Sequence, residues 1–524
     1  MSNSSAFLLR DILIRNDQLF PNNTAMFDGD VAITYRELFR RINRARAVLG
    51  YLGIRPGDRV GILMENNAAY IELLLAVAHM GSIAVPLNTR LTADELQFIL
   101  NDAEASLLIT SSAFKHLAEA TYARLSSVTN GLIVDSDTPE GQFQSYKVVQ
   151  AETEAAPKTL GGIGELSEDS TAILVYTSGT TGSPKGCMTT QRSWIGNSLN
   201  MAIAFSLSTE DRYLALLPFF HVGGLGALFA QLHAGGTVIP MAKYSATGVV
   251  QMIEKYRISV AFLVPPMVQQ VLTLESREQY DLNSLRIVIG AAGFEPPWVS
   301  ARVEDDLHAK FYGIYGQTES GNIVASATRN AIASSPSTYG RELPAFRVRI
   351  VDDSDEEVPV GSPGELTLRG PSVMSGYWRR EEATRKALRG DWLHTGDIFV
   401  RHPDGTLEMV DRKTYIIKTG GENVYPAEVE HVLAAHPSVA DVCVIGIPDP
   451  VWGETVKACI VLRLGHAPSR SELVSWCREH VAAYKAPRYI EWVEEIPRSH
   501  SGKPLKDVLK ARPTHSTQGI AHLE

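Results

Sequence analysis

A loop rich in glycine, serine and threonine is the segment of this sequence best suited to binding phosphate. It reads Thr177-Ser178-Gly179-Thr180-Thr181-Gly182-Ser183-Pro184-Lys185-Gly186 and directly follows an apolar, strand-like run. Glycines let backbone amides approach an anion closely, the hydroxyl groups are further donors, and Lys185 adds a positive charge. A Walker A loop counted from Gly179 would need glycine where Pro184 stands, which argues against a P-loop kinase. The loop therefore predicts a polyphosphate site of a different kind.

Two further segments each carry a carboxylate within three residues of a glycine. In Tyr315-Gly316-Gln317-Thr318-Glu319 the ring can stack on adenine, Thr318 can donate to a phosphate, and the hard carboxylate of Glu319 suits Mg²⁺. In Thr395-Gly396-Asp397 the carboxylate can accept hydrogen bonds from both hydroxyls of a ribose. The simpler interpretation of each is a solvated acidic residue in a turn.

His221 lies in a stretch, from Tyr213 to Ala242, that contains no Asp, Glu, Lys or Arg. On length alone such a stretch can span a bilayer. Its Pro218, its two histidines and its paired glycines would break a spanning helix and leave polar groups in lipid. We therefore expect buried core and the lining of an apolar pocket, and no membrane span.

Taken together, these segments resemble the adenylate-forming superfamily, and in particular its acyl-CoA synthetase branch. Seven motifs occur in that family's order and cover nearly the whole chain. They lie at residues 177–186, 218–224, 290–293, 315–319, 392–397 with 411–412, 418–426 and 497–503. The departures are Gly293, where many relatives carry proline, and Thr414, which stands at a hinge position commonly occupied by Asp or Lys.

The resemblance implies a role for each matching residue. Glu319 would bind Mg²⁺, His221 would gate the acyl pocket, and Lys503 would be the catalytic lysine. Lys418, Gly420 and Gly421 would line the CoA tunnel, and Thr414 would be the hinge. The residues that would bind ATP or AMP are Thr177, Ser178, Gly179, Thr180, Thr181, Gly182, Lys185, Gly290, Ala291, Ala292, Tyr315, Gly316, Gln317, Thr318, Asp397 and Arg412.

The reaction that the resemblance implies has two steps. A carboxylic acid attacks the α-phosphorus of ATP, with Lys503 neutralising charge on the transferring phosphate, and pyrophosphate leaves. The small domain then rotates, so that the CoA thiol can attack the acyl-adenylate and release AMP. Two alternatives stay open: an adenylating enzyme that loads a carrier protein or oxidises the adenylate, and a catalytically inactive binding protein on the same scaffold.

The acid also stays open at this point. The uncharged stretch suits fatty, alicyclic or aryl acids, and so favours a role such as fatty acid metabolism. Glu295 would instead suit a cationic, carnitine-like acid.

Charge and composition limit the other partners. The 524 residues include 49 basic and 59 acidic side chains, a net charge of −10, which disfavours nucleic acid. The four cysteines have no metal-ligand spacing, and the N-terminus lacks the features of a signal peptide, so we expect a cytoplasmic protein. A homo-oligomeric state is left open.

The elements that must position these motifs change in kind along the chain. Strand-like runs at 58–64, 83–87, 172–176, 259–264 and 285–289 alternate with helical patterns such as 68–80, which predicts mostly parallel sheets with helices on both faces. Short strands at 346–351, 364–369, 398–401 and 407–410 predict a β-rich, barrel-like subdomain. Later, helical patterns at 427–435 and 470–483 alternate with strands at 415–418, 439–447, 456–464 and 489–493.

We therefore expect an α/β chain with two domains. The large N-terminal adenylation domain, residues 1–411, would comprise two αβ lobes and the β-rich subdomain at about 340–411. The small C-terminal domain, residues 412–524, would be a mobile α+β unit that carries Lys503.

Overall fold

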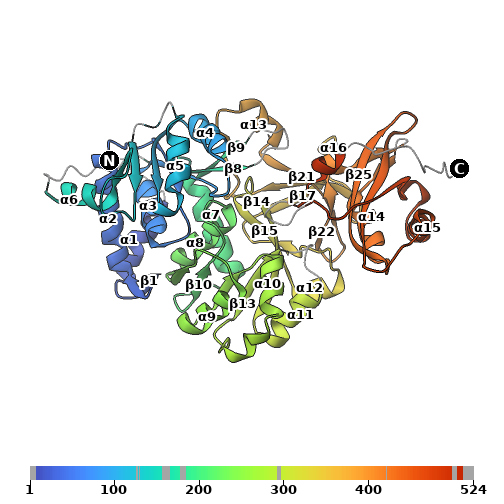
Figure 1. Cartoon of the computed structure of the whole chain (residues 1–524), viewed down its shortest axis with the longest axis horizontal. Coiled ribbons are helices and arrows are strands. Elements are labelled where there is room, and N and C mark those ends of the chain that lie inside the picture. Colours follow the sequence, from blue (N-terminus) through green and yellow to red (C-terminus); the bar gives the residue numbers. More distant parts are fainter. Residues whose placement is uncertain are drawn as a thin grey trace. The chain divides into compact units, whose positions relative to one another are not determined.

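The chain forms two compact units in the computed structural model (Figure 1), which describes residues 7–125, 128, 130–155, 166–177, 184–291, 297–419, 422–498 and 504–511. Unit 1 comprises residues 1–348 and 367–394, and unit 2 comprises residues 349–366 and 395–524. The predicted β-rich region at 340–411 thus contributes to both units. The domain boundary expected at residue 411 stays a prediction.

Unit 1 contains two large mixed sheets, of which the nine-stranded one is antiparallel at both ends and the eight-stranded one only at one end. The nine-stranded sheet has the order β16 (Arg341–Glu342), β15 (Asn322–Thr328), β14 (Lys310–Gln317), β13 (Ile287–Ala291), β12 (Val260–Phe262), β10 (Arg212–Ala215), β11 (Thr237–Pro240), β1 (Thr24–Asp28) and β2 (Val31–Thr34). The eight-stranded sheet has the order β19 (Gly376–Tyr377), β9 (Lys185–Thr190), β8 (Thr171–Thr177), β4 (Ile83–Pro86), β3 (Arg59–Leu63), β5 (Ala105–Thr110), β6 (Asn130–Ile133) and β7 (Phe143–Ser145).

The change from parallel to antiparallel pairing falls at two hairpins that matter for the site. Strand β8 pairs in parallel with β4 but antiparallel with β9. Strand β14 pairs in parallel with β13 but antiparallel with β15. Both predicted phosphate-binding segments, at 177–186 and 315–319, therefore lie where a parallel sheet turns back on itself.

Helices cover both faces of these sheets, as the alternating pattern predicted. The helices of unit 1 are α1 (Leu9–Leu19), α2 (Tyr35–Tyr51), α3 (Ala68–Met80), α4 (Ala93–Asp102), α5 (Lys115–Tyr122), α6 (Tyr146–Ala155), α7 (Gln191–Ala204), α8 (Val222–Ala234), α9 (Ala246–Tyr256), α10 (Pro265–Leu272), α11 (Pro297–Asp306), α12 (Arg329–Ser334) and α13 (Glu381–Ala387). Helices α9, α10 and α11 pack on one face of the nine-stranded sheet, and α7 and α8 lie on the other (Figure 1). The α/β fold class is confirmed.

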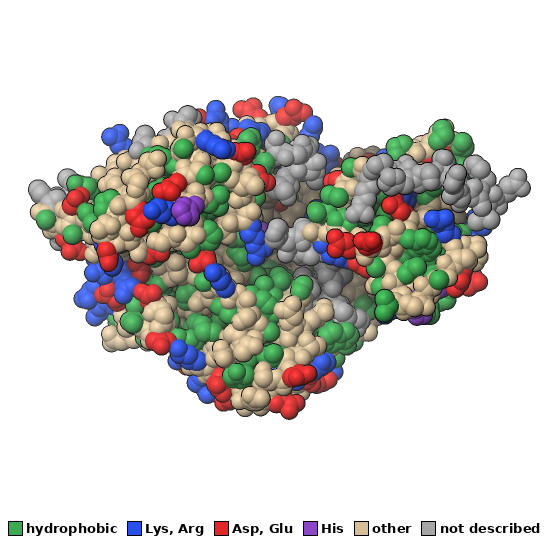
Figure 2. Space-filling view, viewed as in Figure 1, with side chains coloured by type: hydrophobic (Ala, Val, Ile, Leu, Met, Phe, Trp, Pro, Cys, Tyr) green, Lys and Arg blue, Asp and Glu red, His purple; other side chains and the backbone are tan. Residues whose placement is uncertain are grey.

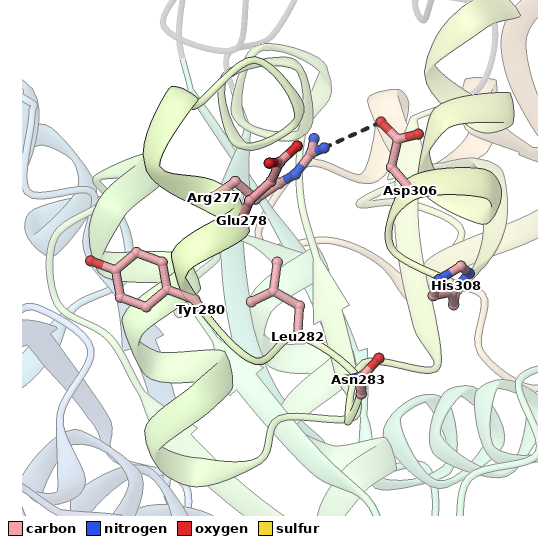
Figure 3. Close-up of a pocket in the computed structure, with 7 residues that line it drawn as sticks. All are labelled: Arg277, Glu278, Tyr280, Leu282, Asn283, Asp306 and His308. Atoms are coloured by element: carbon pink, nitrogen blue, oxygen red, sulfur yellow. Dashed lines mark hydrogen bonds and ion pairs between the residues drawn. The ribbon is translucent and has the colours of Figure 1, made fainter.

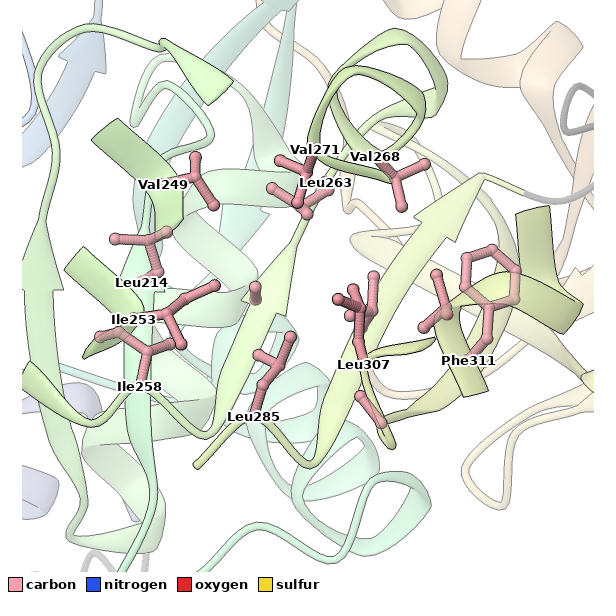
Figure 4. Packing of buried hydrophobic residues seen from close by; sticks show 14 of the residues in the cluster. Leu214, Val249, Ile253, Ile258, Leu263, Val268, Val271, Leu285, Leu307 and Phe311 are labelled. Carbon is pink, nitrogen blue, oxygen red and sulfur yellow. The ribbon is translucent and has the colours of Figure 1, made fainter. Parts of the chain in front are cut away.

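The core under α9 to α11 shows why the strands are continuous apolar runs. Leu214 and Phe311 from the strands, Ile253 from α9 and Val271 from α10 are all almost completely buried in one cluster (Figure 4). Strands covered on both faces need apolar residues at every position, because no face is left for solvent. The same packing fixes the strand ends that carry the site.

The uncharged stretch divides into three elements, namely β10, α8 and β11. Helix α8 has 13 residues and ends at Gly235, which has a φ of +80°. Leu214, Leu228 and Ile239 are buried in unit 1, so the expectation of buried core is confirmed. Among the described residues, no helix has the length and apolarity needed to cross a bilayer.

A five-stranded sheet and another mixed sheet complete the fold. The former has the order β17 (Arg347–Val351), β18 (Pro363–Arg369), β21 (Trp392–Arg401) and β20 (Leu388–Arg389), with β22 (Leu407–Arg412) also on β21. The latter has the order β24 (Glu422–Val424), β23 (Ile417–Thr419), β26 (Gly453–Leu462) and β25 (Val439–Asp449), with β27 (Tyr489–Trp492) on β26. Helices α14 (Pro426–Ala434), α15 (Arg470–His480) and α16 (Lys506–Ala511) complete unit 2.

Candidate active site

The predicted phosphate loop begins at the end of β8 and ends at the start of β9, two strands that pair in antiparallel fashion. Thr177 and Lys185 are direct partners across the two strands, so they stand side by side. Both side chains are partly exposed. Ser178, Gly179, Thr180, Thr181 and Gly182 lie outside the described residues.

A tight turn between β14 and β15 presents Thr318 and Glu319. The hydroxyl of Ser320 accepts a hydrogen bond from Gln317 N at 3.1 Å and lies 2.8 Å from Gln317 O, to which it donates. Gly321 closes the turn with a φ of +75°, and a Cβ there would lie 1.9 Å from the carbonyl oxygen of Ser372. Only glycine fits this conformation and this approach, so Gly321 fixes the place where Glu319 emerges.

Tyr377 brings the two predicted phosphate-binding segments together. Its hydroxyl donates a 2.9 Å hydrogen bond to Oε1 of Glu319. The Nζ of Lys185 lies 5.3 Å from the centroid of its ring, a cation–π distance. Burial, together with the nearby Glu319, raises the pKa of Tyr377, so the phenol stays a neutral donor. The sequence analysis missed Tyr377, because it lies 58 residues from Glu319 and in no motif that we singled out.

The carboxyl ends of β13 and β14 bring the predicted adenine segments side by side. Gly290 pairs with Gly313, and Ala291 pairs with Ile314, immediately before Tyr315. The ring of Tyr315 is buried and makes an edge contact with Tyr339, with centroids 5.4 Å apart. Gly316 and Gln317 complete β14, and Ala292 lies outside the described residues.

His221 stands at the start of α8, at the end of a tightly held loop. Buried Asn66 donates to the carbonyl oxygens of Ala215 and Leu217 and accepts from Phe219 N, at 2.8 to 3.0 Å. A Cβ on Gly224 would lie 2.4 Å from the carbonyl oxygen of Pro218, so the helix can begin there only with glycine.

The imidazole of His221 is exposed, yet it is surrounded by enough protein to change its protonation. Desolvation by burial, with Arg90 nearby, lowers its pKa to about 4. The ring of Phe220 lies against it, with centroids 4.6 Å apart. His221 is therefore a neutral group that solvent can reach, as a pocket-lining residue must be.

In unit 2, the predicted ribose carboxylate is held by a cation. Asp397 and Arg412 are direct partners on β21 and β22, and Arg412 Nε lies 3.2 Å from Asp397 Oδ1. The preceding Gly396 donates its N–H to Oε1 of Glu365 at 3.0 Å. Glu365 is itself buried and pairs with Lys413 Nζ at 3.0 Å. Glu365 is thus a second residue that the sequence analysis missed, since it lies 31 residues from Gly396.

The other predicted residues of unit 2 lie further along the chain. Thr414 is exposed in a short 3₁₀ segment, Lys413–Tyr415, directly after β22. Lys418 is exposed on β23, and its backbone N–H donates to Glu454 Oε2 at 2.9 Å. Gly420, Gly421 and Lys503 lie outside the described residues.

A pocket of about 340 Å³ occurs elsewhere in unit 1 (Figure 3) and is separate from these residues. Its lining residues are Arg277, Glu278, Tyr280, Leu282, Asn283, Asp306 and His308. Arg277 is already paired with Asp306 at 3.4 Å. These residues precede β13 and β14, at the opposite ends of the strands from Ala291 and Tyr315, so the pocket does not belong to the candidate active site.

On the face drawn in Figure 2, acidic and basic side chains are scattered among apolar and other side chains. Among the described residues, no cluster of three or more His, Cys, Asp or Glu could hold a metal ion by itself. Mg²⁺ that binds together with phosphates usually takes several of its oxygen ligands from the substrate and from water.

Comparisons with known proteins agree with this fold and this set of residues. The family model described as AMP-binding enzyme matches residues 13–378, and the model of the AMP-binding enzyme C-terminal domain matches residues 428–503. The chain therefore belongs to the AMP-binding enzyme family, as one of its adenylate-forming acyl-CoA ligases.

Its relatives cover almost its full length. Feruloyl-CoA synthase from Amycolatopsis sp is 37% identical over 503 residues, 95% of this chain and 98% of that one. A 2-succinylbenzoate–CoA ligase from Bacillus cereus is 31% identical over 499 residues, 95% of this chain and 97% of that one. The structure of O-succinylbenzoate coenzyme A synthetase from Bacillus subtilis, in complex with ATP and magnesium ion, has a TM-score of 0.80 at 29% identity, covering 95% of this chain and 99% of that one.

Proposed function

We propose that this acyl-CoA ligase activates an apolar carboxylic acid, and in particular an aryl acid. One observation carries the assignment of the ATP site: Glu319 and Lys185, which lie at the ends of two hairpins, both contact Tyr377. Both relatives described above are named for acids that contain an aromatic ring. The uncharged β10–α8–β11 region, with the neutral His221 at its helix start, is suited to such an acid.

The residues of unit 1 would bind the phosphates and the metal. Lys185 and Thr177, with the loop 178–183, would bind the phosphates of ATP, and Gly290, Ala291 and the Tyr315 segment would contact adenine. Glu319 fits a Mg²⁺ ligand, because it is a hard oxygen donor and the hydrogen bond that it accepts from Tyr377 comes from a neutral group. Bound Mg²⁺ would offset the charge that builds up on the leaving pyrophosphate.

The residues of unit 2 would bind the ribose and complete the reaction. Asp397, held by Arg412, would accept the two ribose hydroxyls. Lys503 would neutralise charge on the transferring phosphate in the first step. The domain of residues 412–524 would then rotate at Thr414, so that Lys418, Gly420 and Gly421 face the CoA thiol.

Pyrophosphate release across a panel of acids tests the proposal. The panel contains ferulate, 2-succinylbenzoate, benzoate, an alicyclic acid, a medium-chain fatty acid and a carnitine-like acid, each with and without CoA. We expect the highest kcat/KM with an aryl acid, and AMP release that depends on CoA. A preference for the carnitine-like acid would contradict the apolar pocket and direct attention to Glu295, which lies outside the described residues.

The remaining outcomes separate the alternatives for the acceptor. Pyrophosphate release with CoA-independent turnover would indicate a carrier protein or another acceptor. No pyrophosphate with any acid would indicate a catalytically inactive binding protein. A cytoplasmic location and a homo-oligomeric state are also proposals, which cell fractionation and light scattering would test.

A further inference from the structure

Tyr377 contacts both of the side chains that the proposed function places on the phosphates of ATP. Its hydroxyl donates to Glu319 Oε1 at 2.9 Å, and its ring faces Lys185 Nζ, 5.3 Å from the ring centroid. The three residues come from different strands or turns of unit 1, and all three are partly exposed. Tyr377 therefore lies between Glu319, the carboxylate proposed for the metal ion, and Lys185, the lysine proposed for the phosphates.

The backbone around Tyr377 is fixed to both of these segments. Strand β19 pairs with β9, with Trp378 N donating to Gly186 O at 2.8 Å and Ser375 N to Met188 O at 3.0 Å. On the other side, Met374 N donates to the carbonyl oxygen of Glu319 at 2.9 Å. Because the main chain is bonded to both segments, the phenol has a defined position between them.

A tyrosine between a lysine and a glutamate has a clear electrostatic consequence. Without it, the ammonium of Lys185 could pair with Glu319 directly, which would neutralise the carboxylate and remove the lysine from the phosphates. Within the described part of the chain, no ion pair of 4.0 Å or less joins Lys185 to Glu319. A phenol donates to the carboxylate without cancelling its charge, and its π-face holds the ammonium by a weaker attraction.

We propose that Tyr377 is a positioning residue for the adenylation step: its hydroxyl orients Glu319 toward the metal ion, and its ring keeps Lys185 apart from Glu319 and directed to phosphate. This inference rests on the proposed function of Glu319 and Lys185. Tyr377 itself does not touch the reacting atoms. Its two contacts can be removed separately, which makes the role testable.

The first variant, Tyr377→Phe, removes only the hydroxyl. Binding of Mn²⁺ to the full-length protein with a non-hydrolysable ATP analogue, followed by electron paramagnetic resonance, should weaken about tenfold, the loss expected for a hydrogen bond to a charged group. The Mg²⁺ concentration for half-maximal pyrophosphate release should rise by a similar factor. Affinity for the analogue without metal should not change, because the ring still faces Lys185.

The second variant, Tyr377→Leu, removes the ring as well. We expect it to weaken metal-free binding of the ATP analogue several-fold in addition, because Lys185 is then free to pair with Glu319. The matched control is Tyr256→Phe, which removes another tyrosine hydroxyl bonded to a carboxylate, at 2.8 Å from Asp30 Oδ1. Tyr256 precedes β12, at the end of the sheet opposite the site, so Mn²⁺ binding in this variant should match the unchanged protein.

Distinct results would overturn the inference or the proposed function. If Tyr377→Phe binds Mn²⁺ as tightly as Tyr256→Phe, the positioning role is wrong while the proposed function stands. If Tyr377→Phe loses metal-free and metal-dependent binding equally, with a lowered melting temperature, the role is structural only and the inference fails. If the unchanged protein releases no pyrophosphate with any acid, the proposed function fails, and the Mn²⁺ measurement still decides whether Tyr377 orients Glu319.

Discussion

Each of the two units holds a carboxylate that we propose for the nucleotide, but the two are held in different ways. In unit 1, Glu319 is partly exposed and accepts a hydrogen bond from the neutral phenol of Tyr377. In unit 2, Asp397 is only 3% exposed and is paired with the guanidinium of Arg412. The phenol and the guanidinium suit different proposed roles of the two carboxylates.

The physical difference lies in whether a cation within the protein already compensates the negative charge of the carboxylate. A metal ligand must keep its negative charge, so a neutral donor is the appropriate partner. An acceptor for ribose hydroxyls needs orientation more than charge, and an arginine supplies it through a directed ion pair. The buried Glu365 adds to this in unit 2 by binding both Gly396 N and Lys413. The following changes test this contrast, from the largest expected effect to the smallest.

The largest effect should follow from Lys503→Ala, which removes the lysine that we assign to the first step only. Adenylate formation, measured as pyrophosphate release, should be abolished, because no other group then neutralises charge on the transferring phosphate. Thioester formation from supplied acyl-AMP should be spared. Equal loss of both half-reactions would show that unit 2 contributes to catalysis in some other way.

The second change, Glu319→Gln, keeps the shape of the side chain and an oxygen for Tyr377 but removes the charge. Pyrophosphate release should fall on the order of 100-fold, the usual cost of losing one electrostatic contact to a transition state. Binding of ATP without metal should stay the same. Glu382→Gln, which changes an exposed carboxylate paired with Lys386, is the matched control and should behave as the unchanged protein.

The third change, Asp397→Asn, alters the carboxylate of unit 2. The KM for ATP should rise about tenfold, because one ribose acceptor is lost and Arg412 loses its partner. The Mg²⁺ requirement should not change, in contrast to Glu319→Gln. A changed Mg²⁺ requirement in steady-state kinetics would contradict the different roles of Asp397 and Glu319, since it would place the metal near Asp397.

The smallest effect concerns the stability of unit 1. A measurement of stability distinguishes a variant that changes only the site from one that unfolds the unit carrying it. Burial, with Arg46 beside it, lowers the pKa of His79 from 6.5 to about 4. Between these values the unfolded chain binds more protons than the folded one. The contribution of neutral His79 to the stability of the folded state is therefore complete above pH 6.5, and it is lost as the pH falls toward 4.

Urea unfolding at pH 7 and pH 5 measures this effect. The free energy of unfolding of the unchanged protein should be lower at pH 5 than at pH 7, and His79 should account for about 2 kcal/mol of this difference. His79→Gln does not titrate in this range, so its loss should be smaller by that amount. Equal losses in the two proteins would mean that His79 is solvated in the folded state.

Local patterns predicted most elements of the fold with small errors at their ends. The helix expected at 68–80 is α3, Ala68–Met80, which starts at the Asn67 cap and stops at Gly81 with a φ of +82°. The helix expected at 470–483 is α15, which ends at His480, because Val481 adopts an extended conformation with a ψ of 162°. Caps that involve glycine or a short polar side chain are visible in a sequence, whereas an apolar residue that leaves the helix is not.

The motifs predicted which residue types would carry the chemistry, and why those types suit phosphate, ribose and metal. They also predicted the α/β fold class and the reaction class, which the family comparison confirms. These properties depend on local composition and on spacing along the chain, so the sequence contains them directly. The individual site residues stay predictions until the variants are measured.

Only the tertiary structure decided which partner each functional group receives. Tyr377 reaches Glu319 across 58 residues, because β19 pairs with β9 beside the β14–β15 turn. Glu365 reaches Gly396 across 31 residues. Hydrogen bonds of this kind depend on the register of strands that are distant in sequence, and hydrophobic periodicity carries no record of that register. The sequence by itself therefore named the carboxylates, and the packing of the strands determined whether each of them is paired with a neutral phenol or with a cation.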